Sequence, residues 1–154
     1  MDTLISNVTT VTMNEKMEVL FGSFIGISDG KITYIGASAP EETPEKILDG
    51  TGMVAIPGLV NAHTHLATTA LRSYLDDADN REMLTQLLQK EAKMDSKAAK
   101  ASALLGIAEC LRFGITSVSD LYYFPSATAE AAAEAGAEDG ADLKIMRRKK
   151  GAKR

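Results

Sequence analysis

The two histidines of this chain stand two residues apart, in a segment from Ile56 to Leu66 that reads Ile-Pro-Gly-Leu-Val-Asn-Ala-His-Thr-His-Leu. Side chains alternate across a β-strand, so His63 and His65 project to the same side while Thr64 points the other way. Two imidazoles at the end of one strand can bind one metal ion, and zinc and iron both accept neutral imidazole nitrogen. An ion held there makes water acidic enough to supply hydroxide at neutral pH. A His-x-His pair by itself leaves open the alternative of two surface histidines without a role.

The residues before this motif have the composition of β-strands. Leu4 to Met13 is rich in Val, Ile and Thr, and two β-branched runs flank Asp29-Gly30. Asp-Gly between such runs predicts a type I′ hairpin, because both central residues must take positive φ. We expect a small antiparallel sheet here, with strands at Ser23–Ser28 and Lys31–Ile35. A further strand pair is predicted at Ile47–Leu48 and Met53–Ile56.

After Pro57 the pattern changes to alternating strands and helices. Strands are predicted at Gly58–Ala62 and Ile115–Tyr123, and helices at about Arg81–Met94, Ser96–Phe113 and Ser126–Ala135. Asp95 or Ser96 is expected to cap the second helix at its start, and Gly114 is expected to end it. Strand, helix, strand, helix is typical of a parallel sheet or barrel, so we predict an α/β fold.

The last residues differ from the rest of the chain in charge. Seven of the 17 Lys and Arg residues lie between Lys144 and Arg154, which leaves residues 1–137 with a net charge of -8 against -4 for the whole chain. The basic run has no periodicity, and we expect the tail 138–154 to be disordered. An acidic body argues against a nucleic-acid platform built on the fold, although the tail alone leaves nucleic-acid binding open as a minor alternative.

Cysteine content and hydropathy indicate a protein of the cytoplasm. Cys110 is the single cysteine, it cannot form an internal disulfide, and its place in an apolar helical pattern predicts a small core residue. No basic and apolar leader opens the sequence, and no apolar run approaches the roughly 18 residues that span a membrane. We therefore expect a soluble, cytoplasmic protein without membrane contacts.

The motif and its flanks resemble the amidohydrolase superfamily, whose first barrel strand typically reads Pro-Gly, two hydrophobic residues, Asn or Asp, then x-His-x-His. Residues 57–65 match that pattern position by position. Within the superfamily the chain looks most like the cytosine and adenosine deaminase branch, especially the deaminases of S-adenosylhomocysteine and methylthioadenosine. The phrases that carry this narrower resemblance are Asp49-Gly50-Thr51-Gly52-Met53, Leu71-Arg72-Ser73-Tyr74 with Asp76-Asp77, and Gly114-Ile115-Thr116-Ser117 with Asp120 and Tyr122.

The resemblance implies the N-terminal part of a (β/α)₈ TIM-type barrel, preceded by a small antiparallel β-sandwich segment. It divides the chain into a β-rich segment (1–56), the first two βα units of the barrel (57–137) and the basic tail (138–154). It also implies that His63 and His65 are the strand 1 ligands of a divalent metal, zinc in preference to iron. The family's other ligands, histidines of strands 5 and 6 and an aspartate of strand 8, have no counterpart here, so the implied site is incomplete.

The implied activity is hydrolysis of a non-peptide C–N bond, such as deamination of a purine nucleoside-like small molecule, with this chain as an inactive fragment. Those deaminases usually carry tryptophan in a segment where this chain has Met83 and Gln89, which leaves the adenine-type substrate open. Asp120 is interpreted either as an acceptor of backbone hydrogen bonds or as a further ligand. Arg72 either contacts a substrate anion or forms a surface ion pair.

Two rival hypotheses remain at this point. One is a non-catalytic binding or oligomerisation module that self-associates through uncovered barrel edges and apolar helix faces. The other is a metal-binding or nucleic-acid-binding protein recruited through the tail. Because a third apolar strand is missing after Gly136 in the sequence pattern, we also hypothesise a frameshift or premature stop near residue 137.

Overall fold

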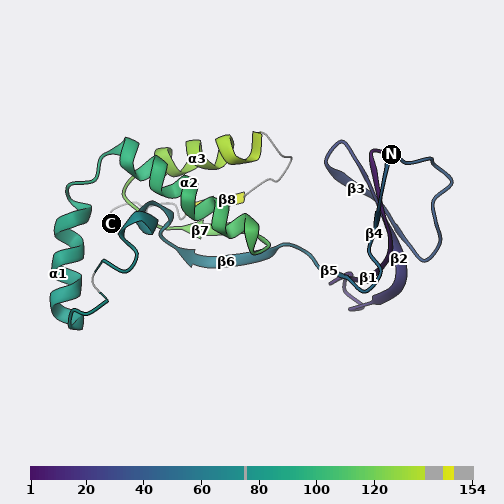
Figure 1. Ribbon diagram of the computed structural model, residues 1–154, viewed down its shortest axis with the longest axis horizontal. Helices are drawn as coiled ribbons and strands as arrows, with labels where there is room; N and C mark the ends of the chain where they lie inside the picture. Colours follow the sequence, from purple (N-terminus) through teal and green to yellow (C-terminus); the bar gives the residue numbers. More distant parts are fainter. Residues whose placement is uncertain (75, 138–143, 148–154) are drawn as a thin grey trace, which may run out of the picture. The chain divides into compact units, whose positions relative to one another are not determined.

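The computed structural model describes residues 1–74, 76–137 and 144–147, and it consists of two compact units, Met1–Pro57 and the residues from Gly58 onward. Each unit contains a sheet of its own (Figure 1). No helix in these described ranges is long and apolar enough to cross a membrane.

The first unit is a five-stranded sheet in the order β3-β2-β1-β4, with β5 also paired to β1. Its strands are β1 (Thr3–Val11), β2 (Val19–Ser28), β3 (Lys31–Gly36), β4 (Lys46–Asp49) and β5 (Val54–Ala55). Strand β2 is antiparallel to both β1 and β3. Asp29 and Gly30 connect β2 to β3 with φ of 51° and 68°, so the predicted hairpin with two positive φ angles is confirmed.

Strands β4 and β5 correct the expectation of an antiparallel sheet, because both run parallel to β1. They lie along the same edge of β1, and the turn at Gly50 separates them. A Cβ on Gly50 would lie 2.7 Å from the Cβ of Val8, so only glycine allows the backbone to pass this close to β1. Strands β4 and β5 run in the same direction on either side of this turn. Both therefore pair with β1 in the parallel sense.

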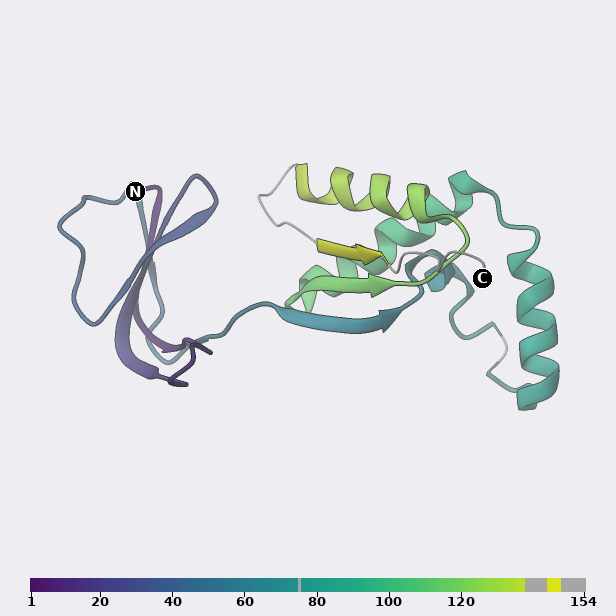
Figure 2. The same cartoon turned by 180° about the vertical axis from the view of Figure 1, so that it is seen from behind.

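The second unit is built on a parallel sheet in the order β6-β7-β8. Its elements in chain order are β6 (Leu59–Thr64), the 3₁₀ helix η1 (Leu66–Leu71), α1 (Asn80–Glu91), α2 (Ser96–Arg112), β7 (Ile115–Asp120), α3 (Pro125–Ala137) and β8 (Lys144–Arg147). Helices α2 and α3 lie together on one side of this sheet, whereas α1 stands apart, beyond the carboxyl ends of β6 and β7 (Figures 1 and 2). The predicted α/β alternation is confirmed.

Small side chains let α2 and α3 approach the sheet closely. The buried cluster between these layers consists of Leu66, Ala103, Ile107, Cys110, Val118, Ala131 and Ala132. Ile107 and Val118 are fully buried at its centre. Cys110 is also buried there, as its helical position predicted, and this desolvation raises the pKa of its thiol, with a smaller contribution from the charge of Glu109.

The ends of α2 follow the sequence signals. The Asp95 carboxylate accepts a 2.7 Å hydrogen bond from the backbone N–H of Ala98, so Asp95 rather than Ser96 is the N-cap. Gly114, just after the helix, has φ of 76° and donates to the carbonyl oxygen of Leu111 at 3.0 Å. The positive φ explains the glycine that ends this helix.

Strand β8 corrects the expectation that the whole tail is disordered and that only two strands of this sheet are present. Lys144–Arg147 pairs in parallel with β7, from Ser117 to Asp120. The free edge of β7 offers a row of backbone hydrogen-bonding groups, which a short segment can pair with whatever its side-chain pattern. The rest of the predicted disordered tail, 138–143 and 148–154, lies outside the described residues.

Candidate metal centre

The two histidine rings meet at the carboxyl end of β6. Their Nε2 atoms are 3.3 Å apart, and the ring planes are nearly perpendicular at 88°. Both side chains are exposed. Two nitrogen ligands of a tetrahedral zinc ion with bonds of about 2.0–2.1 Å lie about 3.3 Å from each other, so the observed separation fits one shared ion.

The stretch of β6 that contains His63 departs from the regular pairing with β7 and forms a β-bulge. Asn61 pairs with Val118 of β7, and the next pair of the ladder is Thr64 with Asp120. Three residue steps on β6 therefore span two on β7, which leaves one extra residue in the stretch that contains His63. Bulges of this kind bend a strand and redirect its side chains. Alternation along a strand predicts that both histidines lie on one side, but it does not predict the bulge.

A backbone carbonyl orients His65. The Nδ1 atom of His65 lies 2.6 Å from the carbonyl oxygen of Leu121, which follows directly after β7. A carbonyl oxygen only accepts hydrogen bonds, so Nδ1 carries the proton and Nε2 keeps its lone pair free. This is the tautomer that a metal ligand bound through Nε2 requires, with its other nitrogen donating to a second group. The carbonyl has no sequence signature and was missed.

Asp120 joins the ends of the two strands. Its Oδ1 atom accepts a 2.8 Å hydrogen bond from the backbone N–H of Leu66, at the start of η1. Nearby, the N–H of Leu121 donates to the carbonyl oxygen of Thr64 at 3.1 Å. The interpretation of Asp120 as an acceptor of backbone hydrogen bonds is confirmed. These two bonds hold the backbone on both sides of His65.

No further metal ligand joins the pair in the part of the chain that the structure describes. Within it, no three or more His, Cys, Asp and Glu side chains are grouped so that they could hold one ion. Cys110 is buried in the helix–sheet core. The described geometry therefore offers two nitrogen ligands, whereas catalytic zinc sites normally use three protein ligands and one open position.

Arg72 is engaged in an ion pair. Its guanidinium donates two hydrogen bonds to the Glu109 carboxylate, at 2.9 and 2.6 Å, and ties the end of η1 to α2. The Arg72 hydrogen bonds hold the pKa of Glu109 below its ordinary value. Of the two interpretations of Arg72, the structure supports the ion pair.

An aromatic patch lies beside the histidines. The ring of Tyr122 is 6.4 Å from that of His65, centroid to centroid, and it also contacts the rings of Tyr123 and Phe124. The Tyr122 hydroxyl is buried, and it has no hydrogen-bond partner among the described residues. Desolvation raises the pKa of Tyr122 to about 12, with smaller contributions from Glu91 and Tyr123.

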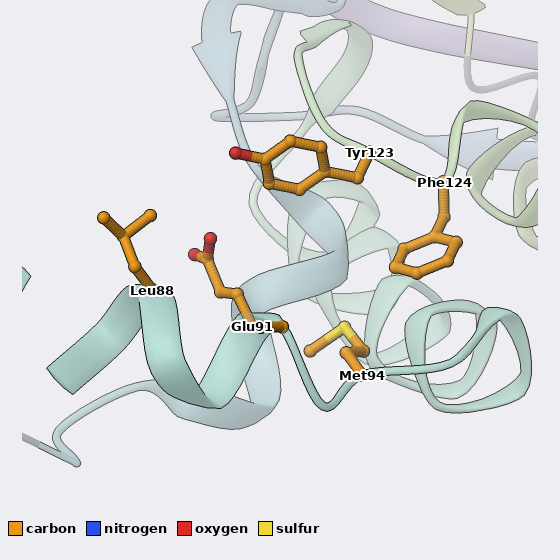
Figure 3. A pocket seen from close by; sticks show the side chains of 6 residues that line it. Leu88, Glu91, Met94, Tyr123 and Phe124 are labelled. Atoms are coloured by element: carbon orange, nitrogen blue, oxygen red, sulfur yellow. The ribbon is translucent and has the colours of Figure 1, made fainter. Parts of the chain in front are cut away.

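This patch borders a pocket of about 260 Å³ between the end of α1 and the segment after β7. Leu88, Glu91 and Met94 face Tyr123 and Phe124 across it (Figure 3). The lining is apolar apart from the Glu91 carboxylate and the Tyr123 hydroxyl. Apolar residues on a predicted helix are equally expected in a core, so the sequence alone does not indicate a functional role for these residues.

Comparison with known proteins identifies the family of this chain. The family model described as "Amidohydrolase family" matches residues 54–151. A 5-methylthioadenosine/S-adenosylhomocysteine deaminase from Thermoanaerobacter pseudethanolicus is 35% identical over 132 residues, which are 85% of this chain and 31% of that protein. The predicted resemblance to such deaminases is confirmed.

Two solved structures also match this chain. The zinc complex of the atrazine chlorohydrolase TrzN from Arthrobacter aurescens TC1 matches with a TM-score of 0.80 and 26% identity, over 94% of this chain and 35% of that chain. A zinc-bound adenosine deaminase from Xanthomonas campestris matches with a TM-score of 0.75 and 28% identity, over 86% of this chain and 31% of that chain.

The chain belongs to the amidohydrolase family. It spans about a third of the length of the relative and of the solved structures described above.

Proposed function

We propose that this chain supplies the strand 1 metal ligands, His63 and His65, of a metal-dependent hydrolase that acts on non-peptide C–N bonds. The observation that carries the proposal is the 3.3 Å separation of the two Nε2 atoms together with the hydrogen bond from His65 Nδ1 to Leu121. One ring nitrogen of His65 is committed to the backbone, and the other faces His63. Zinc is the proposed metal because imidazole nitrogen suits it and the two solved relatives contain it.

When bound, a divalent metal supplies the activation of water for hydrolysis. The residues of this chain hold the two imidazoles in place: Leu121 fixes the tautomer of His65, and Asp120 fixes the backbone that follows it. The proposed substrate is a purine nucleoside-like or related heterocyclic small molecule. The deaminase names of the relatives support deamination, and the TrzN name, which refers to a chlorinated triazine, supports a heterocycle more broadly.

We further propose that β6, β7 and β8 correspond to the first strands of a (β/α)₈ barrel, with the tail contributing the third. The five-stranded sheet of Met1–Pro57 corresponds to a sandwich segment that precedes the barrel. Two histidines provide only part of the ligand set that the resemblance implies. The 154-residue chain is accordingly proposed to bind a metal without catalysing hydrolysis by itself.

Elemental analysis of the purified chain, freed of any histidine tag, tests the metal site. The wild-type chain is compared with a His63→Ala/His65→Ala double variant after equilibration with zinc and gel filtration. Up to one zinc per chain in the wild type, and none in the variant, is the expected result. Equal zinc in both proteins would refute the assignment. Ammonia release from adenosine-type nucleosides by the wild-type chain alone would contradict the proposed lack of activity.

A second candidate function is self-association without catalysis. It is favoured by the exposure of apolar residues on β6, where Leu59 and Val60 are 48% and 60% exposed, and by the position of β6 at the edge of its sheet. Sedimentation velocity tests it. A discrete dimer or larger species that persists in the double histidine variant would support this role, and a monomer across the micromolar range would exclude it.

A further inference from the structure

Between Asn61 and Thr64, β6 has one residue more than the facing stretch of β7. The ladder pairs Asn61 with Val118 and then Thr64 with Asp120, so the backbone around Ala62 and His63 leaves the regular pattern. A bulge costs hydrogen bonds of the ladder, and backbone N–H groups freed in this way need another acceptor. His63, a proposed metal ligand, lies within this irregular stretch.

The side chain of Asn61 provides that acceptor. Its Oδ1 atom accepts a hydrogen bond from the backbone N–H of His63 at 3.2 Å. Asn and Asp side chains commonly bond to the backbone two residues further on, and they stabilise local turns by doing so. The Asn61 side chain is half-buried, so its amide is held near the strand rather than free in solvent.

We propose that Asn61 is a positioning residue of the metal site, which stabilises the bulge that turns His63 Nε2 toward His65 Nε2. The inference rests on the proposed role of the two histidines as metal ligands. Asn61 does not touch the metal in this scheme, since its oxygen is occupied by the His63 backbone. It acts through the backbone of His63, whereas Leu121 acts through the ring of His65. The two ligands thus have separate supports.

The chemistry of the side chain predicts which substitutions matter. Aspartate keeps an oxygen at the same position and can accept the same hydrogen bond, whereas leucine has a similar size and no acceptor. Loss of a group that orients a metal ligand typically lowers metal affinity by about 10–100-fold. We therefore expect Asn61→Leu to weaken metal binding by a factor in that range and Asn61→Asp to retain it within about threefold or to tighten it.

The test is a zinc titration of the 154-residue chain, followed through the ring resonances of its two histidines by NMR. Wild type, Asn61→Leu, Asn61→Asp and the double histidine variant are compared. Hydrogen exchange of the His63 backbone amide is measured without metal, as a direct readout of the bond to Asn61. Asp95→Ala serves as a control, because it removes the α2 cap and lowers stability without altering β6.

The expected result has three parts. Wild type and Asn61→Asp bind zinc with similar affinity, Asn61→Leu binds at least tenfold more weakly with faster exchange at the His63 amide, and Asp95→Ala binds like wild type. Equal affinity of wild type and Asn61→Leu would overturn the role of Asn61 while leaving the metal site intact. An Asn61→Asp chain as weak as Asn61→Leu would also overturn it. Zinc binding by none of the proteins would instead refute the proposed function on which the inference rests.

Discussion

The Nδ1 atom of His65 lies 2.6 Å from the carbonyl oxygen of Leu121, 56 residues further along the chain. This contact links the end of β6 to the segment that follows β7. It determines which nitrogen of His65 is available, because the carbonyl requires a proton on Nδ1. The arrangement of the candidate metal centre therefore depends on the pairing of two strands as well as on the spacing of two histidines.

The first prediction concerns the histidine tautomers. In the metal-free chain we expect His65 to carry its proton on Nδ1, and His63 to carry one on Nε2, from which it donates to the bare Nε2 of His65. Nitrogen-15 chemical shifts of the neutral imidazoles, with His63→Ala to assign the signals, give the measurement. An Nε2-protonated His65 would contradict the contact with Leu121.

The second prediction concerns Asp120. Asp120→Ala removes the acceptor for the Leu66 N–H at a half-buried position, so we expect a loss of about 1–2 kcal/mol in the free energy of unfolding. Asp120→Asn keeps an oxygen that can accept the same bond and should lose less than half of that. Urea unfolding, followed by circular dichroism, compares the three proteins. Equal losses for both variants would mean that charge, rather than this hydrogen bond, determines the effect.

The third prediction concerns the contact between α2 and η1. A Cβ on Gly106 would lie 2.6 Å from Thr69 Oγ1, and the Thr69 hydroxyl is itself bonded to the Leu66 carbonyl oxygen at 2.8 Å. Alanine favours a helix over glycine by about 1 kcal/mol, but overpacking typically costs about 1–3 kcal/mol.

We therefore expect Gly106→Ala to lower the free energy of unfolding. The double variant Gly106→Ala/Thr69→Ala, which removes the obstructing hydroxyl, should recover part of that loss. Thermal and urea unfolding provide the comparison. If Gly106→Ala raises stability, helix propensity outweighs the steric contact and the close packing of η1 on α2 is refuted.

The fourth prediction concerns alkaline pH. The pKa of Tyr122 is raised to about 12 by burial, from an ordinary value near 10. A raised pKa means that the folded state holds the proton more tightly than the unfolded state does. The contribution of Tyr122 to stability is therefore fully present below about pH 10 and is lost as the pH rises toward 12.

We expect the urea midpoint to fall over this alkaline range and to fall less in Tyr122→Phe, which keeps the ring and removes the ionisable hydroxyl. Tyrosinate absorbance should show one tyrosine that titrates late and that is absent from the variant. Identical pH profiles of wild type and Tyr122→Phe would show that other groups cause the alkaline loss.

The fifth prediction uses Cys110 as a probe of folding. Because the thiol is buried and its pKa is raised, we expect it to react with a thiol reagent at least tenfold more slowly in the native chain than in denaturant at the same pH. Reaction at the same rate in both conditions would show that the helix–sheet core does not form in the isolated chain.

Several features of this protein follow from the sequence alone because their causes are local. The Asp29-Gly30 turn, the Asp95 cap and the end of α2 at Gly114 each depend on residues within a few positions of one another. The motif around His63 and His65 identified the family for the same reason: its residues are contiguous, and their chemistry can be read without knowing what lies beside them.

Other features depend on backbone atoms that come together from distant parts of the chain, and only the tertiary structure determines them. Main-chain groups, which every residue carries, form the parallel pairing of β4 and β5 with β1 and the pairing of β8 with the edge of β7. A main-chain carbonyl, that of Leu121, also accepts the hydrogen bond from His65. The bulge between Asn61 and Thr64 is likewise a matter of how β6 pairs with β7. The residue types in the sequence identify His63 and His65 as candidate ligands. The pairing of backbone strands across the sheet determines how the two side chains face each other.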